Sequence, residues 1–509
     1  MNELVVLGCV LTIDEDRRVH RGGAVYVHDG RIEHVGDAAD AAPAGYEHAP
    51  RVRTGGVVAP GLIDLHNHLA YNTLPLWVGR AEPYGTRYQW PRAATYGPDV
   101  SNPAQAIGIA APAAALRFAE VKAAIGGVTA IQGSPPVTRS FPGWMLRNVE
   151  NENLGRGQTI FQSVLPATAE QLDANAARMA GGFAFIYHLA EGVDSALQRE
   201  FQFLDDHGCV RDGLVGIHST ALTDDDFRVW KQRGSGAIVW SPFSNLWLYG
   251  DTTDVLSARR RGLRVCLGSD WTPSGTRNVL GELKVATRWN RVALDGALEP
   301  ADLVELVTAN PGDTLARPWQ APVGRLVEGA LADLACFAPV RADPWQTVLT
   351  ATERHVRLVV VGGRPVYGNR ALLERAGVQR AESITVAGVR RGVVMDLPDE
   401  LMPEEADLRA EATKSWAQGL QELRAVWKDP GGAVRRARDA RAFGVEPLQF
   451  EPDLPGPDGS AARALTDDEL DQLAMPDFDG IGHDAAWFDR VRRACPDHAE
   501  ILCDLDDEF

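Results

Sequence analysis

Two histidines close the stretch Pro60-Gly61-Leu62-Ile63-Asp64-Leu65-His66-Asn67-His68. Side chains alternate across a β-strand, so Asp64, His66 and His68 point to one side of this stretch, while Ile63 and Leu65 point to the other. Two neutral imidazoles on one side can reach a single metal ion. The pair alone is weak evidence, because the chain has 12 histidines in 509 residues and such a spacing also arises by chance. A metal site is therefore indicated only if further ligands occur at positions that the fold can bring close to this pair.

Short apolar runs alternate with helix-forming stretches through the middle of the chain. The runs are 128–132, 159–164, 184–188, 214–218, 237–240 and 264–269. Apolar strands separated by helices indicate a parallel sheet that is covered on both faces. With the strand that carries His66 there are seven such strands, and their ends recur at about one βα repeat of roughly 30 residues. The fold class is therefore predicted to be α/β, with residues 59–319 forming a (β/α)8 barrel of the TIM type.

Two of the helices between these strands have clear signals. Residues 110–125 are rich in helix-forming side chains, and Leu222-Thr223-Asp224-Asp225-Asp226 offers an N-cap followed by acidic residues in the first turn. Both signals place a helix directly between two of the expected strands, as the barrel requires.

Both ends of the barrel region are flanked by β-rich sequence. Residues 24–28 and 31–35 alternate around the turn Asp29-Gly30, which is typical of a hairpin. Similar stretches return at 332–337 and 356–361. We therefore expect residues 1–58 and 320–385 to combine into one composite, small β-sandwich domain.

The last quarter of the chain differs in composition from the rest. Residues 390–509 contain 14 basic and 28 acidic residues, so most of the formal net charge of −18 lies there. Helical spacing of apolar residues predicts one amphipathic helix over 403–427, followed by a loop-rich stretch over 429–460. Thr466-Asp467-Asp468-Glu469 is a capping box that opens another helix. Residues 386–509 are thus predicted to be an acidic extension of helices and loops.

Composition also limits the partners and the location. The six cysteines are scattered, with no C-x-x-C pair, which fits reduced thiols in the cytoplasm. No run of about 18 uncharged apolar residues occurs, so we expect neither a membrane span nor a signal peptide. The acidic net charge argues against nucleic acid as a partner, because phosphate binding needs clustered Lys and Arg. A small-molecule substrate and a homo-oligomeric state are expected instead.

Further metal-competent groups stand at the ends of the predicted strands. His188 closes one apolar run and Glu191 follows three residues later, His218 closes the next run, and Asp270 follows a later one. Singly, each could be a buried histidine or a helix cap. Jointly, they would meet at one rim, because the C-terminal ends of all strands of a parallel barrel converge there. The sequence therefore predicts a catalytic metal site at this rim.

These motifs resemble those of the amidohydrolase superfamily. The resemblance rests on P-G-L-I-D-x-H-x-H at 60–68, H-x-x-E at 188–191, His218 and the Ser-Asp pair at 269–270; the segment 241–245 is similar to the P-x-S-N segment of the aminohydrolase branch, which contains cytosine, triazine and adenosyl-type deaminases. It covers about residues 3–370. The family has three barrel strands between His68 and His188, where this sequence offers two, so one βα unit is expected to be degenerate and the barrel distorted.

The resemblance implies a mononuclear site. His66, His68, His188 and Asp270 would bind one divalent metal ion, with zinc as the first choice and iron as the alternative. No lysine stands at a strand end before His188 to bridge a second metal, since Lys122 lies in a predicted helix. A single metal with an open position suits hydrolysis by an activated water.

The resemblance also implies the catalytic roles. Asp270 would take a proton from the attacking water, Glu191 would protonate a ring nitrogen and then the leaving amine, and His218 would polarise the group under attack. Asp64 would either support the ligands or serve as a hydrogen-bonding core residue. The residues expected to contact the substrate are Tyr71, Trp77, Asn245 and Trp271.

The reaction expected from these roles is hydrolysis of a non-peptide C–N bond, and specifically deamination of an aminated N-heterocycle. Opening of a cyclic amide or amidine ring, as in relatives similar to imidazolonepropionase, uses the same groups and is the alternative. A barrel that binds a small molecule without catalysis is the alternative from another class.

Overall fold

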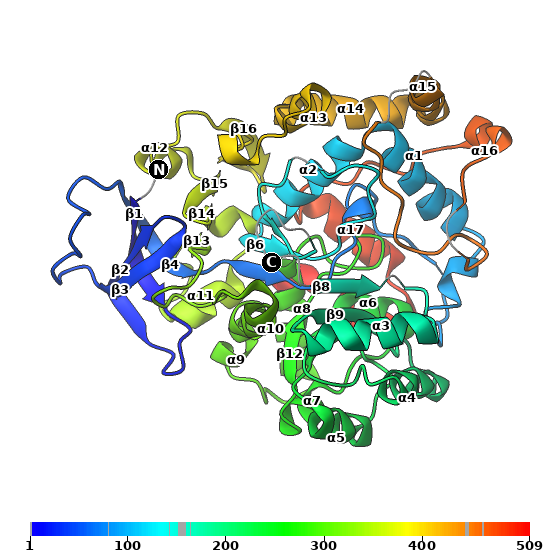
Figure 1. The fold of residues 1–509 in the computed structure, drawn as a ribbon, viewed down its shortest axis with the longest axis horizontal. Helices are drawn as coiled ribbons and strands as arrows, with labels where there is room; N and C mark the ends of the chain where they lie inside the picture. The colour runs from blue at the N-terminus through cyan, green and yellow to red at the C-terminus, as the bar shows by residue number, and fades with distance from the viewer. Residues whose placement is uncertain are drawn as a thin grey trace.

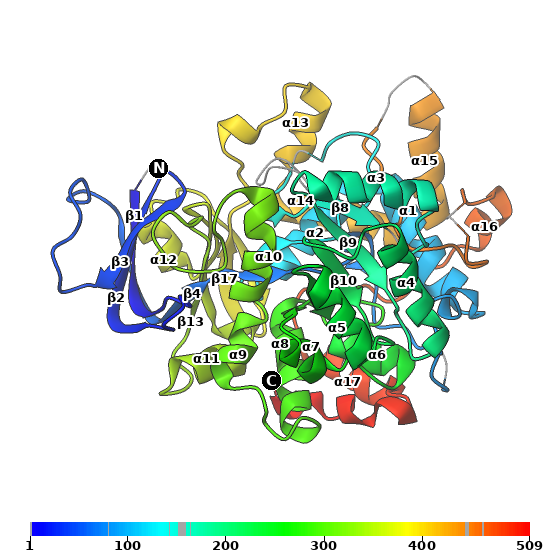
Figure 2. The same cartoon turned by 60° about the horizontal axis from the view of Figure 1, so that its bottom comes forward.

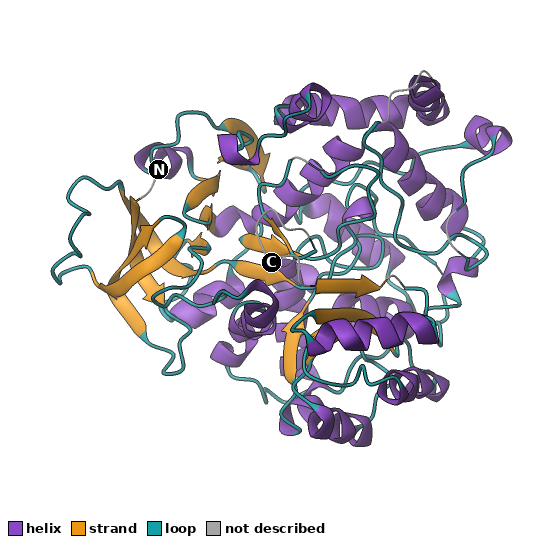
Figure 3. Cartoon of the chain, in the orientation of Figure 1, coloured by secondary structure: helices purple, strands orange, loops and turns teal. Residues whose placement is uncertain are grey.

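A barrel of parallel strands lies beside a large sheet, and helices of the C-terminal extension pack against the barrel (Figure 1). The computed structural model describes residues 3–508 except 80, 142, 151–158, 163, 443–446 and 461–462. Figure 3 shows the strands gathered in the large sheet and in the barrel, with most helices around the barrel. Within the described residues, no helix combines the length and the apolar composition needed to cross a membrane.

The barrel contains eight described strands in two hydrogen-bonded groups. The first group is β5 (Leu62–Asp64), β6 (Val128–Ile131) and β7 (Arg147–Asn148); the second is β8 (Thr159–Gln162), β9 (Ala184–Leu189), β10 (Leu214–His218), β11 (Ala237–Trp240) and β12 (Arg264–Leu267). All neighbouring pairs within the groups are parallel. A bridge between Asn67 and Asp270 joins the two groups beyond the ends of β5 and β12. The prediction of a distorted α/β barrel is confirmed.

The strand that the sequence failed to indicate is β7. It has two residues, Arg147 and Asn148, both buried, and it pairs with β6. Neither residue is apolar, so this strand carries no hydrophobic pattern that a sequence could display. The expected degenerate βα unit is therefore this one. The predicted strand 159–164 appears as β8, and its residue 163 lies outside the described residues.

Helices connect the barrel strands. They are α1 (Asn102–Ala110), α2 (Pro112–Ala124), α3 (Ala169–Ala180), α4 (Gln198–Asp206), α5 (Asp224–Arg233), α6 (Pro242–Tyr249), α7 (Val255–Arg260), α8 (Val279–Val292), α9 (Pro300–Glu305) and α10 (Ala309–Trp319). The helix predicted at 110–125 is α2. Thr223 caps α5 through a reciprocal capping box with Asp226, as its sequence signal indicates.

The large sheet joins strands from both flanks of the barrel. Its order is β16 (Glu382–Val386), β17 (Val389–Val393), β15 (Arg364–Gly368), β14 (Val356–Val361), β13 (Leu334–Phe337), β4 (Arg51–Pro60), β1 (Glu3–Leu11), β2 (Val19–His28) and β3 (Arg31–Asp37). Two short helices, α11 (Pro344–Thr350) and α12 (Arg370–Arg375), pack against it. Hydrogen bonds link all nine strands into one continuous sheet, where the sequence suggested a two-layered sandwich. Strand β17 of this sheet lies beyond residue 385, where the sequence placed the end of the composite domain. The domain boundaries stay a prediction.

The turn between β2 and β3 illustrates why this sheet forms. Asp29 and Gly30 both have positive φ, 43° and 75°, which is the backbone of the two-residue turn that matches the twist of a hairpin. The register then pairs His28 with Arg31. The hairpin predicted from 24–35 is confirmed.

The C-terminal extension reaches the barrel from two sides. Helices α13 (Ala406–Ala412), α14 (Trp416–Lys428) and α15 (Pro430–Ala442) lie on one side, and α17 (Ala485–Ala494) lies on the opposite side (Figure 2). The capping box at Thr466 opens α16 (Asp467–Gln472), as predicted. Loops of the extension run between these helices across the barrel.

Three expectations for the C-terminal extension are wrong. The single helix at 403–427 is broken, because Ser415 caps a new helix, α14, with its side chain on Gln418 N. The stretch 430–442, expected to be a loop, is helix α15, since Pro430 is tolerated in a first turn and the following Ala and Arg residues favour helix. Cys495 and Cys503 form a disulfide, with Cα atoms 5.7 Å apart, where six thiols were expected.

Candidate metal centre

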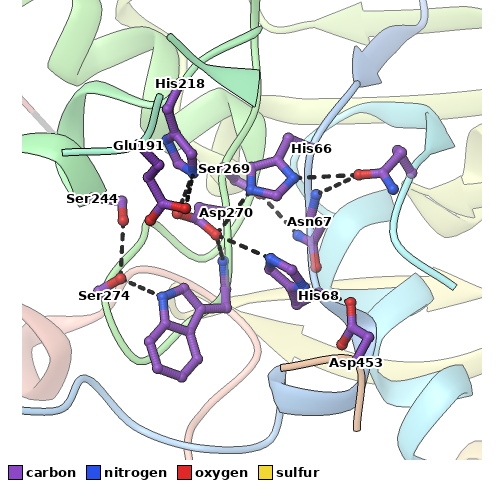
Figure 4. Close-up of polar contacts among 12 residues, drawn as sticks. His66, Asn67, His68, Glu191, His218, Ser244, Ser269, Asp270, Ser274 and Asp453 are labelled. Carbon is purple, nitrogen blue, oxygen red and sulfur yellow. Dashed lines mark hydrogen bonds and ion pairs between the residues drawn. The ribbon is translucent and has the colours of Figure 1, made fainter. Parts of the chain in front are cut away.

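The predicted ligands and the predicted catalytic residue His218 lie at the C-terminal ends of the barrel strands. Figure 4 shows His66, His68, His218 and Asp270. His66 and His68 follow β5, His188 lies in β9, His218 ends β10, and Asp270 follows β12. All five residues are at most 3% exposed. His218 and Asp270 have φ of 61° and 59°, which is costly for residues with a side chain and is typical of functional positions. The fold thus brings these residues together within one buried cluster.

Two imidazole nitrogens converge on one carboxylate oxygen. The Nε2 atom of His66 lies 3.1 Å from Oδ1 of Asp270, and the Nε2 atom of His68 lies 3.6 Å from the same oxygen. The ring centroid of His188 lies 4.9 Å from that of His66 and 5.3 Å from that of His68. The geometry is that of donor atoms facing a common point.

The Nδ1 atoms of His66 and His68 each contact a side-chain oxygen on the side of the ring away from Asp270. His66 Nδ1 donates to Oε1 of Gln132 over 3.3 Å, and His68 Nδ1 donates to Oδ2 of Asp453 over 2.6 Å. Both acceptors are oxygens, so the neutral form of each ring carries its proton on Nδ1 and presents a lone pair at Nε2. This is the tautomer that a metal-binding histidine adopts when a neighbouring oxygen fixes its ring.

The donor set fits a divalent metal. Two overlapping groups, His66 with His188 and His218, and His66 with His68 and Asp270, each place their donor atoms within 4.8 Å of one another. Nitrogen donors with one carboxylate are ligands that zinc and iron accept. Among the described residues, Nε2 of His66 has no hydrogen-bond partner although it is buried, which is costly unless another ligand satisfies it.

The electrostatics of His188, His218 and Asp270 favour their metal-binding protonation states, whereas those of His68 favour its protonated form. Burial, reinforced by the neighbouring histidines, holds the pKa of His188 well below its ordinary value. Burial also lowers the pKa of His218. Burial opposes ionisation of Asp270, but His66, His218 and His68 together outweigh it, and the pKa of this carboxyl lies below its usual range. In His68 burial lowers the pKa, but Asp453 outweighs that effect and the net shift is upward.

Asp64 supports the loop that carries Asp270. Its Oδ1 accepts the backbone N–H of Ser269 over 3.0 Å, and its Oδ2 accepts the Ser269 hydroxyl over 2.5 Å. Burial raises the pKa of Asp64 to about 6, and the hydrogen bonds from Ser269 limit the rise. Asp64 thus contacts the residue next to a predicted ligand, which favours the supporting role over that of an ordinary core residue.

Glu191 and His218 lie beside Asp270. Nε2 of His218 is 3.7 Å from Oε2 of Glu191 and 3.7 Å from Oδ2 of Asp270. The hydroxyl of Tyr249, the last residue of α6, donates to Oε1 of Glu191 over 2.5 Å. Oε2 of Glu191 is buried and has no hydrogen-bond partner among the described residues, so one carboxylate oxygen is held and the other faces the cluster.

The four residues expected to contact substrate are all buried around this cluster. Asn245, on α6, accepts from Nδ1 of His218 at 3.5 Å. The ring of Trp271 packs 5.4 Å from that of Tyr71 and 6.4 Å from that of Trp77, within a larger aromatic group. The indole N–H of Trp77 donates to Thr95 over 3.0 Å, so it is engaged within the protein. Substrate contact by these residues stays a prediction.

Three residues of the site were not predicted from the sequence. Gln132 directly follows β6, so its place at a strand end could have revealed it. Tyr249 stands four residues after Asn245 on the same helix, a spacing that places both on one face. Asp453 lies in a loop of the C-terminal extension, 385 positions from His68, and no local pattern indicates it.

Comparison with known proteins gives a family and a set of relatives. A model of the Amidohydrolase family matches residues 184–366. A 5-methylthioadenosine/S-adenosylhomocysteine deaminase of Syntrophobacter fumaroxidans is 27% identical over 416 residues, which cover 73% of this chain and 94% of the relative. A 5'-deoxyadenosine deaminase of Methanopyrus kandleri is 26% identical over 204 residues, 37% of this chain and 46% of the relative.

Solved structures share the fold. Atrazine chlorohydrolase of Arthrobacter aurescens, crystallised with zinc, superposes with a TM-score of 0.54 at 18% identity, covering 71% of this chain and 95% of that one. Guanine deaminase of C. acetobutylicum, crystallised with guanine, gives a TM-score of 0.55 at 15% identity, covering 72% and 100%. More than a quarter of the present chain therefore lies outside the parts matched by these structures.

Proposed function

Because the chain belongs to the amidohydrolase superfamily, we propose that it is a metal-dependent aminohydrolase, which hydrolyses a C–N bond of an aminated N-heterocycle and releases ammonia. The observation that carries this proposal is the convergence of Nε2 of His66 and His68 on Asp270, with Glu191 and His218 alongside. Those groups are the ligands and the proton-transfer residues that such a reaction requires.

We assign the metal to His66, His68, His188 and Asp270, and zinc is the first choice because nitrogen-rich, four-ligand sites suit it. A divalent metal held there would lower the pKa of a water molecule and so supply the nucleophile at neutral pH. Iron remains the alternative. Metal analysis of the purified protein decides between them.

The chain's own groups move the protons. Asp270 accepts the proton of the attacking water on Oδ2, the oxygen that lies toward His218. Glu191 delivers that proton through Oε2 to a ring nitrogen, and then delivers the second proton of the attacking water to the departing amine, while Tyr249 holds Oε1 in place. His218 would polarise the substrate group under attack. Burial of the whole cluster excludes bulk water, which strengthens each of these interactions.

The similar proteins suggest which ring is deaminated. The relatives are named for adenosine-type substrates, and one structural neighbour holds guanine. We therefore propose an aminated purine, free or as a nucleoside, ahead of pyrimidines, pterins and triazines. A cytoplasmic location and a homo-oligomeric state stay predictions.

An ammonia-release screen tests the proposal. Zinc-loaded protein is incubated with aminated purines, pyrimidines, pterins and triazines, and His66→Asn protein serves as the control because it lacks a ligand. We expect ammonia from at least one purine, with none from the control. Turnover of a cyclic amide without ammonia would replace deamination by ring opening, and a protein that binds a heterocycle but turns over none would favour the non-catalytic barrel.

A further inference from the structure

The acidic C-terminal extension supplies a carboxylate to the candidate metal centre. Asp453 lies outside the region in which the family motifs occur, yet its Oδ2 accepts the Nδ1 proton of His68 over 2.6 Å, and both side chains are at most 2% exposed. Figure 4 shows Asp453 on the side of His68 that faces away from Asp270. Burying a carboxylate in this position costs desolvation energy, which its interaction with His68 must offset.

The segment around Asp453 is fixed on both sides. Before it, the carbonyl oxygen of Gln449 accepts the N–H of Thr138 over 2.9 Å, and the N–H of Phe450 donates to the carbonyl oxygen of Gly108 over 3.1 Å. After it, the carbonyl oxygen of Pro455 accepts the hydroxyl of Tyr96 over 2.8 Å. The segment that carries Asp453 is therefore held by helix α1 and by the segments that contain Thr138 and Tyr96.

A second carboxylate of the extension supports the ligand-bearing loops. Asp479 accepts from Nζ of the buried Lys122 over 2.9 Å and pairs with Arg277 over 2.6 Å. Lys122 in turn donates to the carbonyl oxygen of Asn72 over 2.7 Å and to the hydroxyl of Thr272 over 3.1 Å. Asn72 follows His68 by four residues and Thr272 follows Asp270 by two, so both ligand-bearing loops are tied to the extension.

We propose that Asp453 is a positioning residue, which fixes the ring orientation and tautomer of His68 and raises its basicity toward the metal, so that the C-terminal extension is part of the active site. The proposal rests on the metal site proposed above. A carboxylate that accepts the outer N–H of a metal-binding histidine acts in this way, and its loss weakens metal binding by about 10–100-fold. The extension thereby makes metal affinity depend on its own docking.

The test measures metal affinity in the full-length chain. Zinc dissociation constants are obtained by competition with a chromogenic chelator for the wild type, Asp453→Asn and Asp453→Ala. Asn keeps an oxygen acceptor but removes the charge, so we expect weakening of about 10-fold for Asn and up to about 100-fold for Ala. The Asn variant carries the test if the Ala variant fails to fold. Glu451→Gln, an exposed carboxylate in the same segment, is the matched control and should bind as the wild type does.

A second readout separates positioning from a general structural role. With cobalt in place of zinc, saturated Asp453→Asn protein should show a shifted visible absorption band, because the orientation of a ligand has changed; a merely structural role would lower thermal stability and leave the saturated spectrum unchanged. A wild type that binds one metal, together with an Asn variant of equal affinity and spectrum, would overturn this inference alone. A wild type that binds no metal would overturn the proposed function with it.

Discussion

At the scale of single residues, Glu191 is the group on which turnover depends most directly. Its Oε2 faces His218 and accepts no hydrogen bond among the described residues. Glu191→Gln keeps the shape and removes the transferable proton, so we expect kcat to fall by about 10²–10⁴-fold. Metal content should stay at the wild-type level, because Glu191 is not an assigned ligand. Unchanged ammonia release would contradict the role assigned to Glu191.

Tyr249 tests the support of Glu191 by a neighbouring hydroxyl. Its hydrogen bond to Oε1 is 2.5 Å long and buried. A hydrogen bond to a charged group contributes about 1.5–3 kcal/mol, so Tyr249→Phe should lower kcat by at least about 10-fold. Tyr46→Phe, which removes a similar bond to Glu33 in the large sheet, is the matched control and should leave kcat unchanged. Equal kcat values in the two variants would show that Glu191 needs no such support.

At the scale of elements, helix α14 shows how the extension is attached. Trp416 stacks on Phe118 of α2, with ring centroids 5.8 Å apart, and Leu423 is fully buried on the same helix. Leu423→Ala leaves a cavity, so the free energy of unfolding should fall by about 2–5 kcal/mol, measured by denaturant titration. Gln421→Ala on the exposed face should change it by about 0.5 kcal/mol or less. Equal effects of the two substitutions would mean that α14 is not packed as described.

The elements also show what a sequence can and cannot reveal. Strands β9 to β12 have apolar patterns, and their ends carry His188, His218 and Asp270, so both the barrel and its rim could be predicted. Strand β7 has two polar residues and no pattern. The break between α13 and α14 depends on Ser415, which caps α14. Serine also occurs inside helices, so helical periodicity alone predicted one continuous helix across this position.

At the scale of the whole molecule, the contacts between the C-terminal extension and the site could not be predicted. Asp453 and Asp479 reach the site only through the docking of an extension on a barrel, and such contacts between distant segments leave no trace in local spacing. The sequence shows the excess of acidic residues in the extension, but it does not show what these residues contact. Asp453 and Asp479 are buried and pair with basic groups of the barrel. The extension has a composition of its own, but in the folded protein it contacts the site.

The docking of the extension should depend on pH through one buried pair. Glu353, in the short helix η5 (Glu353–His355), pairs with His483 of the extension and accepts from Asn278 over 3.1 Å. Burial opposes ionisation of Glu353, but His483 outweighs it and lowers the pKa of Glu353 to about 2. Since the carboxyl titrates near 4.5 when unfolded, its contribution is complete above pH 4.5 and is lost as the pH falls from 4.5 through 2. The shift corresponds to about 3 kcal/mol.

Comparison with Glu353→Gln isolates this contribution from the titration of other carboxyls. The free energy of unfolding of the wild type should exceed that of the variant by more at pH 5.5 than at pH 3. Over that interval Glu353 takes up a proton in the unfolded wild type but stays ionised in the folded protein, whereas the glutamine of the variant does not titrate. Glu374→Gln, an exposed pair with Arg370, should differ from the wild type by less than about 1 kcal/mol at both values. A gap between wild type and Glu353→Gln that is the same at pH 5.5 and pH 3 would mean that Glu353 does not hold the extension by its charge.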